Sequence, residues 1–257
     1  MTAPGSCEPV YTEQLGDGVL AVVLNQPRKR NAISADMMDL LAAYLRVADA
    51  DEDVRVVVLR GEGEHFSSGG DLTQSGPGEQ TVEAARARLQ RYETVIRTIR
   101  QIGTPVVAMA DGFVVGGAFS LLLACDLVCV SDRVRVVPAF CRIGIVPEMG
   151  LMKLLPDLVG DKVAKEILLA DRELSATDLR ELRLANRVLP PDELEAGTLE
   201  LAHRVAGMPP QSVQITKGIM NAAADTGLEA VLQAETTASP LCTRTEGFRE
   251  TMKRFAR

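Results

Sequence analysis

Asp111-Gly112-Phe113-Val114-Val115-Gly116-Gly117-Ala118 is the stretch of sequence that decides the fold (residues 111–118). It follows an apolar run, 105–110, that is typical of a strand, and it precedes another, 118–125, that suits a buried helix. Paired glycines at such a junction allow positive φ angles and a close approach of a ligand to the backbone. N–H groups at a helix start lack intrahelical acceptors and carry partial positive charge. The stretch therefore predicts a strand–turn–helix unit that presents backbone donors.

A second turn of this kind lies earlier in the chain. Phe66-Ser67-Ser68-Gly69-Gly70-Asp71-Leu72 comes after the β-branched run 54–59, which is typical of a strand buried on both faces. Either turn alone is most simply a tight connection. Two such turns together can hold a developing oxyanion between two backbone N–H groups, which stabilises an enolate or a tetrahedral intermediate.

Outward from these turns, strand and helix patterns alternate up to about residue 150. Gly16-Asp17-Gly18 separates two strand-like runs as a hairpin turn does, and Ser34 is placed to cap a helix. We therefore predict an α/β core with right-handed crossovers. The expected strands cover 10–15, 19–24, 54–59, 105–110, 127–130 and 134–137, and the expected helices follow Ser34 and cover 82–99 and 118–125.

Helical periodicity dominates from Gly150 onward. Its apolar faces must either fold back on the core or pack against another subunit. We therefore expect a core, residues 1–200, and a helical oligomerisation region, residues 201–257. The helical segments cover 163–169, 175–184, 194–205, 213–223, 228–237 and 245–255, and Ser175 is placed to cap the second of them.

Composition disfavours several classes of function. The formal net charge of -7 argues against a nucleic-acid partner. The first residues do not resemble a secretory signal, and the longest apolar stretch, 113–129, is too interrupted to cross a membrane. Five cysteines, mostly in apolar runs, are typical of buried free thiols in a reducing cytoplasm. We expect no metal site, because no Cys or His pair, including the histidines His65 and His203, has ligand spacing.

Five segments, in order and at matching spacing, resemble the enoyl-CoA hydratase/isomerase (crotonase) family, and the resemblance covers most of the chain. The two glycine turns resemble the two oxyanion-hole loops of that family. An earlier segment resembles its CoA-contacting segment, and the last two resemble a loop before a helix and a C-terminal signature. These segments are 24–32, 61–72, 105–127, 142–147 and 246–248.

The resemblance implies a spiral of strand-strand-helix repeats with a helical C-terminal trimerisation region, assembled as a homotrimer or homohexamer. It implies that the N–H groups of Gly70 and Gly117 form an oxyanion hole for the thioester carbonyl of an acyl-CoA substrate. Coenzyme A is then part of the substrate, and no separate cofactor is expected. The residues implied on the CoA side are Arg28, Arg30, Ala32, Ser68, Gly70, Asp71 and Leu72.

The sequence departs from the hydratase pattern where acid–base chemistry is expected. Hydration across a C=C bond needs one group to activate water and one to deliver a proton, which hydratases of this family do with two glutamates. Alignment through the motifs puts Ser120 and Phe140 at these two positions. A carboxylate occurs instead at Glu148, after Pro147, and this Pro-Glu step resembles the peroxisomal type of Δ3,Δ2-enoyl-CoA isomerase, in which one glutamate is the catalytic base.

The sequence therefore predicts a cytoplasmic Δ3,Δ2-enoyl-CoA isomerase, with Glu148 as the proton carrier. Another crotonase-type reaction, such as enoyl-CoA hydration, and a catalytically silent acyl-CoA-binding protein are the alternatives. For Glu148 itself the alternative is a solvated or helix-N-terminal glutamate. We expect Asp71 and Asp126 to hydrogen-bond turns and helix starts, and Ser120 to be a small residue that faces the pocket.

Overall fold

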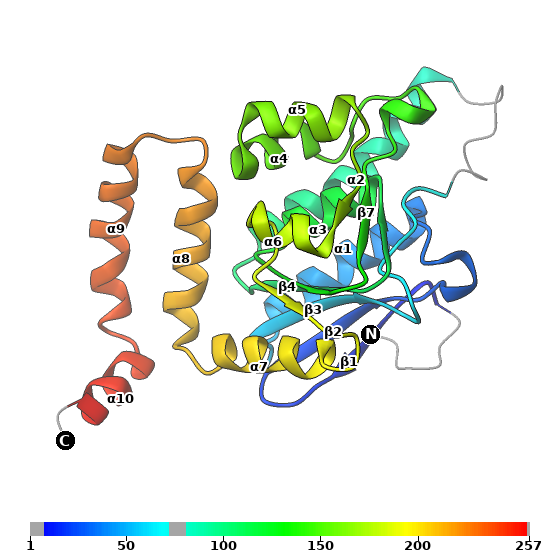
Figure 1. Ribbon diagram of the computed structural model, residues 1–257. Helices are drawn as coiled ribbons and strands as arrows, with labels where there is room; N and C mark the ends of the chain where they lie inside the picture. The colour runs from blue at the N-terminus through cyan, green and yellow to red at the C-terminus, as the bar shows by residue number, and fades with distance from the viewer. Residues whose placement is uncertain (1–7, 72–80, 256–257) are drawn as a thin grey trace.

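A six-stranded sheet forms the base of the computed structural model, which describes residues 8–71 and 81–255 (Figure 1). Its order is β1-β2-β3-β4-β6-β9, and every pairing is parallel except the β1–β2 hairpin. Gly16, Asp17 and Gly18 in that hairpin all have positive φ, as the turn chemistry predicts. The strands are β1 (Val10–Gln14), β2 (Val19–Leu24), β3 (Val56–Gly61), β4 (Val106–Ala110), β6 (Leu127–Ser131) and β9 (Arg187–Leu189).

A second, smaller sheet carries the turn at residues 111–118. It consists of β5 (Phe113–Val115), β7 (Arg135–Val137) and β8 (Leu174–Ser175), in the order β5-β7-β8. The pairing of β5 with β7 continues one step beyond the strand, because the N–H of Gly116 donates to the carbonyl of Val137 over 2.9 Å. The second glycine turn is therefore anchored at the edge of a sheet.

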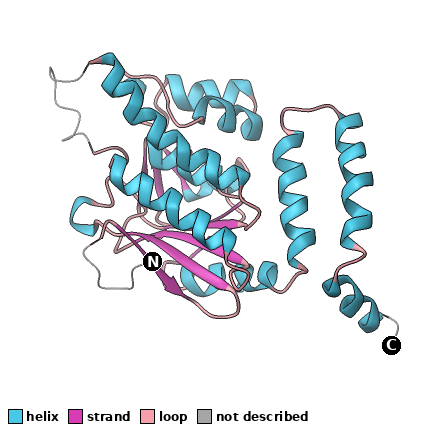
Figure 2. Ribbon diagram, turned by 180° about the vertical axis from the view of Figure 1, so that it is seen from behind, coloured by secondary structure: helices cyan, strands magenta, loops and turns pink. Residues whose placement is uncertain are grey.

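Helices cover both faces of the six-stranded sheet, as the run of apolar residues in β2 and β3 predicts (Figure 2). Alternate residues of these strands enter two separate apolar clusters. Leu20 and Val57 pack with α1 (Ala35–Ala50) and α2 (Val82–Gln101), whereas Val19 and Val56 pack with α7 (Leu194–Ala206). The predicted cap of α1 is present, because Ser34 Oγ accepts from the N–H of Met37 over 3.1 Å.

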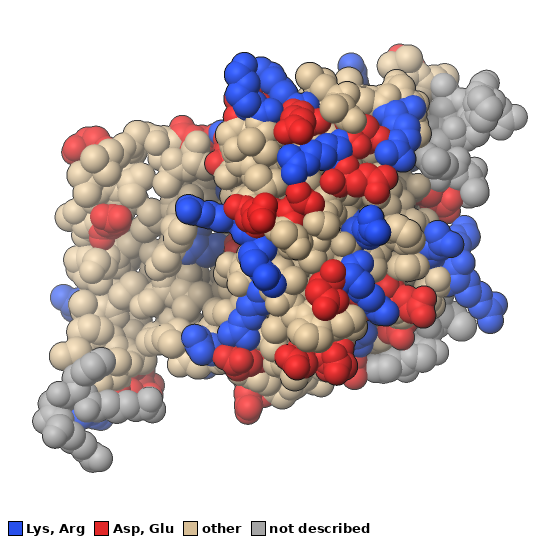
Figure 3. All heavy atoms as spheres, in the orientation of Figure 1, with Lys and Arg blue, Asp and Glu red and all other residues tan. Residues whose placement is uncertain are grey.

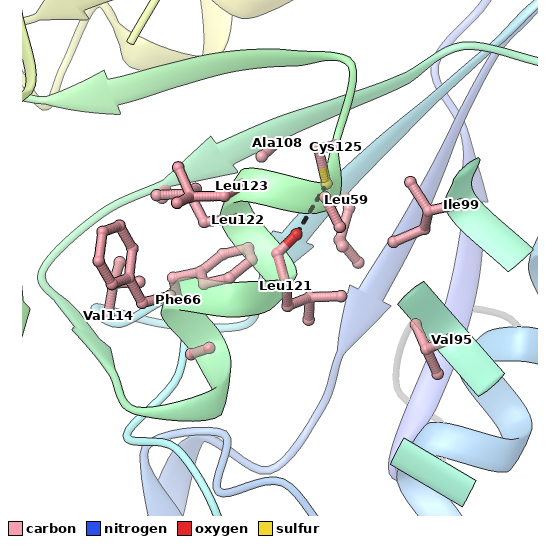
Figure 4. Close-up of a cluster of buried hydrophobic side chains, with 14 of the residues drawn as sticks. Leu59, Phe66, Val95, Ile99, Ala108, Val114, Leu121, Leu122, Leu123 and Cys125 are labelled. Atoms are coloured by element: carbon pink, nitrogen blue, oxygen red, sulfur yellow. Dashed lines mark hydrogen bonds between the residues drawn. The ribbon is translucent and has the colours of Figure 1, made fainter. Parts of the chain in front are cut away.

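The helix α3 (Gly117–Ala124) lies at the centre of the larger cluster (Figure 4). Every residue from 118 to 124 is buried, so this helix has no solvent face. Phe66 and Val114 flank it near its start, and Val95 and Ile99 of α2 lie on another side. Close packing on all sides fixes the position of the N-terminus of α3, where the second glycine turn ends.

Three further helices complete the core: α4 (Leu151–Val159), α5 (Asp161–Leu169) and α6 (Ala176–Glu181). The predicted cap at Ser175 is a full capping box with Asp178. The thiols of Cys125 and Cys129 are buried and free, as expected, but Cys141 is exposed and Cys242 is half-buried, so the expectation of buried thiols is only partly correct. Among the described residues, no helix has the length and apolar character needed to cross a membrane.

The last three helices extend away from the core as an arm (Figures 1 and 3). We call α8 (Pro210–Ala223), α9 (Leu228–Cys242) and α10 (Glu246–Phe255) the C-terminal arm. Lys217 is the buried residue of α8, and its ammonium contacts Asp126 Oδ2 (2.7 Å) and the carbonyl of Thr104 (2.9 Å). No residue of α9 is buried, and the visible face of the arm is largely uncharged. Of the residues of α8 and α9, only Lys217 is therefore buried against the core.

Candidate functional site

The two glycine turns lie side by side. Ser67 of the first turn bridges to β5: its N–H donates to the carbonyl of Phe113 (3.0 Å), and its carbonyl accepts from the N–H of Val115 (3.1 Å). The buried side chain of Ser67 joins a third segment, because its Oγ donates to the carbonyl of Asn31 over 2.7 Å. The same Oγ accepts from the N–H of Gly69 over 3.1 Å. These bonds fix the two turns relative to each other.

Each turn places a glycine of positive φ directly before the predicted donor. Gly69, with φ of +82°, precedes Gly70, and Gly116, with φ of +53°, precedes Gly117. Both conformations favour glycine. Among the described residues, the N–H groups of Gly70 and Gly117 donate to no acceptor. Two backbone donors are thus available to an anionic oxygen, as an oxyanion hole requires.

Both glycines line one cavity of about 160 Å³. Its wall is formed by the two turns, the middle of α2, and the loop that precedes α4. Most of the wall is apolar, with side chains such as Ile33, Phe140 and Met149. The polar side chains on the wall belong to Ser68, Asp71, Arg88, Tyr92 and Glu148. The structure therefore brings Gly70, Gly117 and Glu148 together, as the sequence predicts.

The backbone at Glu148 is tightly positioned. Met149 has φ of +55°, an uncommon value for a residue with a side chain, and Gly150 has φ of +79° at the start of α4. Ser120 Oγ donates to the carbonyl of Glu148 over 2.9 Å. Ser120 is fully buried and is not part of the cavity wall, so the expectation that it faces the pocket is wrong. It holds the main chain of the residue whose side chain does face the cavity.

The carboxyl group of Glu148 is half-buried in this apolar wall. Burial raises its pKa above the ordinary value, because the charged form loses hydration; Arg88 opposes this change and Glu93 adds to it. A carboxylate with a raised pKa accepts a proton more readily than an ordinary one. Glu148 is therefore suited to act as a base.

Asp71 is the other carboxylate on the described wall. Its side chain is only 5% exposed and pairs with Lys29 Nζ at 3.1 Å. Its N–H donates to the carbonyl of Ile33 over 2.8 Å. Asp126 is not on the wall; its carboxylate accepts from the N–H of Val106 over 2.7 Å. Both aspartates thus have structural partners.

Of the residues expected on the CoA side, Ser68, Gly70 and Asp71 line the cavity. Arg28, Arg30 and Ala32 lie on the adjoining segment but not on the cavity wall; the N–H of Ser68 donates to the carbonyl of Arg30 over 2.8 Å. The side chains of Arg28 and Arg30 are exposed, and Ala32 is buried. Leu72 lies outside the described residues. Contact of these residues with CoA stays a prediction.

Residues 14–257 match the sequence profile described as enoyl-CoA hydratase/isomerase. The chain belongs to the enoyl-CoA hydratase/isomerase family. The crotonase-type fold is confirmed by similarity to the crystal structure of an enoyl-CoA hydratase from Bacillus anthracis. That similarity has a TM-score of 0.92 at 27% identity and covers 97% of this chain and 96% of the other.

Relatives within the enoyl-CoA hydratase/isomerase family have names that span several reactions. A 4-chlorobenzoyl coenzyme A dehalogenase-2 from Arthrobacter sp is 32% identical, over 85% of this chain and 80% of its own length. A peroxisomal Delta(3,5)-Delta(2,4)-dienoyl-CoA isomerase from Arabidopsis thaliana is 30% identical, over 82% of this chain and 80% of its own length. Others, from Thermus thermophilus and Mycobacterium, are named as enoyl-CoA hydratases. The family is established, whereas the names alone do not select one reaction.

Three side chains of α2 line the site although the sequence analysis named none of them as a site residue: Arg88, Leu89 and Tyr92. The periodicity of Leu89, Tyr92 and Ile99 marks the apolar face of this helix. Its C-terminal part, with Val95 and Ile99, packs in the core, whereas Leu89 and Tyr92 in the middle of the helix border both the core and the cavity. An apolar face has the same sequence pattern in both settings, which is why these residues of the cavity wall were missed.

Proposed function

We propose that this protein is a Δ3,Δ2-enoyl-CoA isomerase with Glu148 as its single base. The observation that carries the proposal is that Glu148 shares one cavity with the N–H groups of Gly70 and Gly117, neither of which has a partner among the described residues. The other described carboxylate on the wall, Asp71, is paired with Lys29. One base and one oxyanion hole are the groups that this isomerisation needs.

In the proposed reaction, the carboxylate of Glu148 takes a proton from C2 of a 3-enoyl-CoA. The electron pair moves toward the thioester oxygen, and the N–H groups of Gly70 and Gly117 stabilise the resulting dienolate. The protonated Glu148 then returns the proton to C4, which leaves the double bond between C2 and C3. One carboxyl group serves both steps because the proton leaves and returns on the same face of the dienolate.

Hydration is less well supported by this site. Phe140 lines the cavity at one of the two positions where the hydratases have glutamate, and a phenyl ring cannot transfer a proton. Ser120, at the other position, is buried and donates to a backbone carbonyl. A single carboxylate cannot easily both activate water and protonate carbon.

The Glu148→Gln variant tests the proposal. It preserves size and most hydrogen bonding but removes the base, so isomerase turnover on a 3-enoyl-CoA should fall by roughly 10²- to 10⁴-fold. Affinity for a saturated acyl-CoA, measured by calorimetry, should stay nearly unchanged. Equal turnover in the parent and the variant would refute the role of Glu148. A parent that binds acyl-CoAs but converts no enoyl-CoA would favour a silent binding protein.

A second candidate is dehalogenation of an aryl-CoA thioester. It is favoured by the similarity to the Arthrobacter dehalogenase and by the aromatic side chains of Tyr92 and Phe140 on the cavity wall. A carboxylate such as Glu148 can also act as a nucleophile. Chloride release from 4-chlorobenzoyl-CoA, measured beside isomerase activity, distinguishes the two candidates.

We extend the proposal to substrate binding and assembly. The acyl-CoA would lie with its CoA portion toward Ser68, Arg28 and Arg30, and the described core would need no metal or redox cofactor for this reaction. The C-terminal arm would pack against other subunits in a homotrimer or homohexamer, which is supported by exposed apolar side chains such as Leu228, Leu232 and Leu241. A cytoplasmic location stays a prediction.

A further inference from the structure

Tyr92 is a buried tyrosine on the wall of the acyl-CoA cavity. It lies on α2, is 7% exposed, and faces the same cavity as Gly70, Gly117 and Glu148. A ring that only filled space could be phenylalanine, as at Phe140 on the same wall. A buried tyrosine hydroxyl usually has a hydrogen-bond partner, so the partner of Tyr92 indicates what the hydroxyl can do.

The hydrogen bond of the Tyr92 hydroxyl is weak. It donates to the carbonyl of Ile33 at 3.5 Å, the long limit for such a bond. That carbonyl already accepts from the N–H of Asp71 at the much better distance of 2.8 Å. The Ile33 carbonyl therefore keeps a good partner if the hydroxyl turns away. A negatively charged acceptor forms stronger hydrogen bonds than a neutral one, so the Tyr92 hydroxyl would donate to an anion in the cavity in preference to the Ile33 carbonyl.

The hydroxyl contacts the residue that pairs with the segment around Gly70. Ile33 pairs with Gly70 as an isolated parallel bridge, in which the N–H of Ile33 donates to the carbonyl of Gly69 (2.7 Å) and its own carbonyl accepts from Asp71. The hydroxyl bound to the Ile33 carbonyl thus borders the three-residue segment with Gly70 at its centre. The charge of Glu148, which lines the same cavity, also acts on Tyr92.

The hydroxyl is protonated at neutral pH and can donate. Burial is the largest cause of a raised pKa of Tyr92; the charges of Glu148 and Asp71 act in the same direction, and those of Arg88 and Arg91 oppose it. A proton lost from C2 leaves negative charge on the thioester oxygen, between the donors of the cavity. Among the described residues, the bond to the Ile33 carbonyl is the only hydrogen bond of the Tyr92 side chain, so the hydroxyl can turn away from that carbonyl without breaking another.

We propose that Tyr92 is a catalytic residue whose hydroxyl moves from the Ile33 carbonyl to the anion formed when a proton leaves C2 of the substrate, as a third hydrogen-bond donor beside Gly70 and Gly117. This role of Tyr92 rests on the proposed function, because the proposed function places the substrate anion in the cavity that Tyr92 lines. No covalent bond forms or breaks at Tyr92: the proton goes from C2 to Glu148, the electron pair goes toward the thioester oxygen, and Tyr92 keeps its proton.

The experiment compares Tyr92→Phe with Tyr44→Phe. Tyr44 is a matched control, since it is also buried (9% exposed), its hydroxyl also has a hydrogen bond (to Glu8 Oε2 at 2.9 Å), and it does not line the cavity. The first readout is exchange of the C2 protons of octanoyl-CoA in D₂O, followed by mass spectrometry, which reports anion formation without requiring isomerisation. The second is turnover of a 3-enoyl-CoA, and the third is octanoyl-CoA affinity.

Tyr92→Phe should slow C2 exchange and turnover by about 10²-fold, the effect of losing one oxyanion donor. Its affinity for octanoyl-CoA should stay within about threefold, because the ring remains and neutral substrate gains little from the hydroxyl. Tyr44→Phe should match the parent in all three readouts.

Parent-like exchange in Tyr92→Phe overturns the proposal, as does an equal loss in Tyr44→Phe. If Tyr92→Phe binds octanoyl-CoA far more weakly, the hydroxyl serves binding or packing, and the catalytic role is also overturned. A parent that exchanges C2 protons but does not isomerise refutes the proposed function alone; slower exchange in Tyr92→Phe then still supports this inference. A parent that does neither refutes both.

Discussion

Replacing Gly69 with alanine should disturb the site without touching a residue that contacts substrate directly. A residue with a side chain at φ near +82° costs roughly 1–2 kcal/mol. The added Cβ would lie 2.5 Å from the carbonyl oxygen of Val115, which is backbone and cannot easily move. Relief of this overlap should break the bond from Val115 N–H to the Ser67 carbonyl, at a cost of about 1 kcal/mol. Alanine also restricts the unfolded chain more than glycine does, which offsets about 0.4–1 kcal/mol of this loss of stability.

We therefore expect Gly69→Ala to lower the free energy of unfolding by about 2 kcal/mol. Because the two turns move apart in this variant, the N–H groups of Gly70 and Gly117 no longer point at one oxygen atom. Turnover should therefore fall by about 10²-fold or more. Urea unfolding measures the first effect as a lower midpoint at unchanged slope. Gly70→Ala is the stability control, since its Cβ would meet nothing within 4 Å. If Gly69→Ala unfolded at the same urea concentration as Gly70→Ala, the reasoning from turn geometry would fail.

Two further predictions concern charge and assembly. Because burial raises the pKa of Glu148, turnover should increase with pH through a value above the usual carboxyl range, and a rate that does not change with pH there would contradict this assignment. The same shift means that the stability linked to the neutral form of Glu148 is lost as pH rises from the pKa of the unfolded chain to that of the folded protein. Glu148→Gln should therefore melt at a higher temperature than the parent at pH 7, and at the same temperature at a pH below both pKa values. Light scattering should give the mass of a trimer or hexamer, because the C-terminal arm leaves Leu228, Leu232 and Leu241 exposed; a monomeric mass at micromolar concentration would contradict this.

Long, strongly patterned elements could be predicted from the sequence. The caps at Ser34 and Ser175 and the parallel β3, with its continuous apolar run, have local signals that the structure bears out. The strands β5, β8 and β9 were missed because two or three residues are too few for a periodic pattern, whereas the equally short β7 lies in the valine-rich run 134–137 that predicted it. The periodicity gave no bounds for the helix α4, which contains Pro156, a residue that usually ends a helix; only the resemblance at 142–147 implied a helix after that loop.

For the candidate site, too, the sequence determined some features and the tertiary structure decided the others. The glycines, the Pro-Glu step and the missing second carboxylate depend on residue type and order, so the sequence by itself determined the family resemblance and Glu148 as the candidate base. Only the tertiary structure decided that Gly70, Gly117 and Glu148 share a cavity, that Ser120 binds a carbonyl of the main chain, and that Tyr92 faces the same space. The physical reason is that these relations join segments far apart in the chain, through contacts such as the bridge between Ser67 and β5 that leave no periodic trace in the sequence.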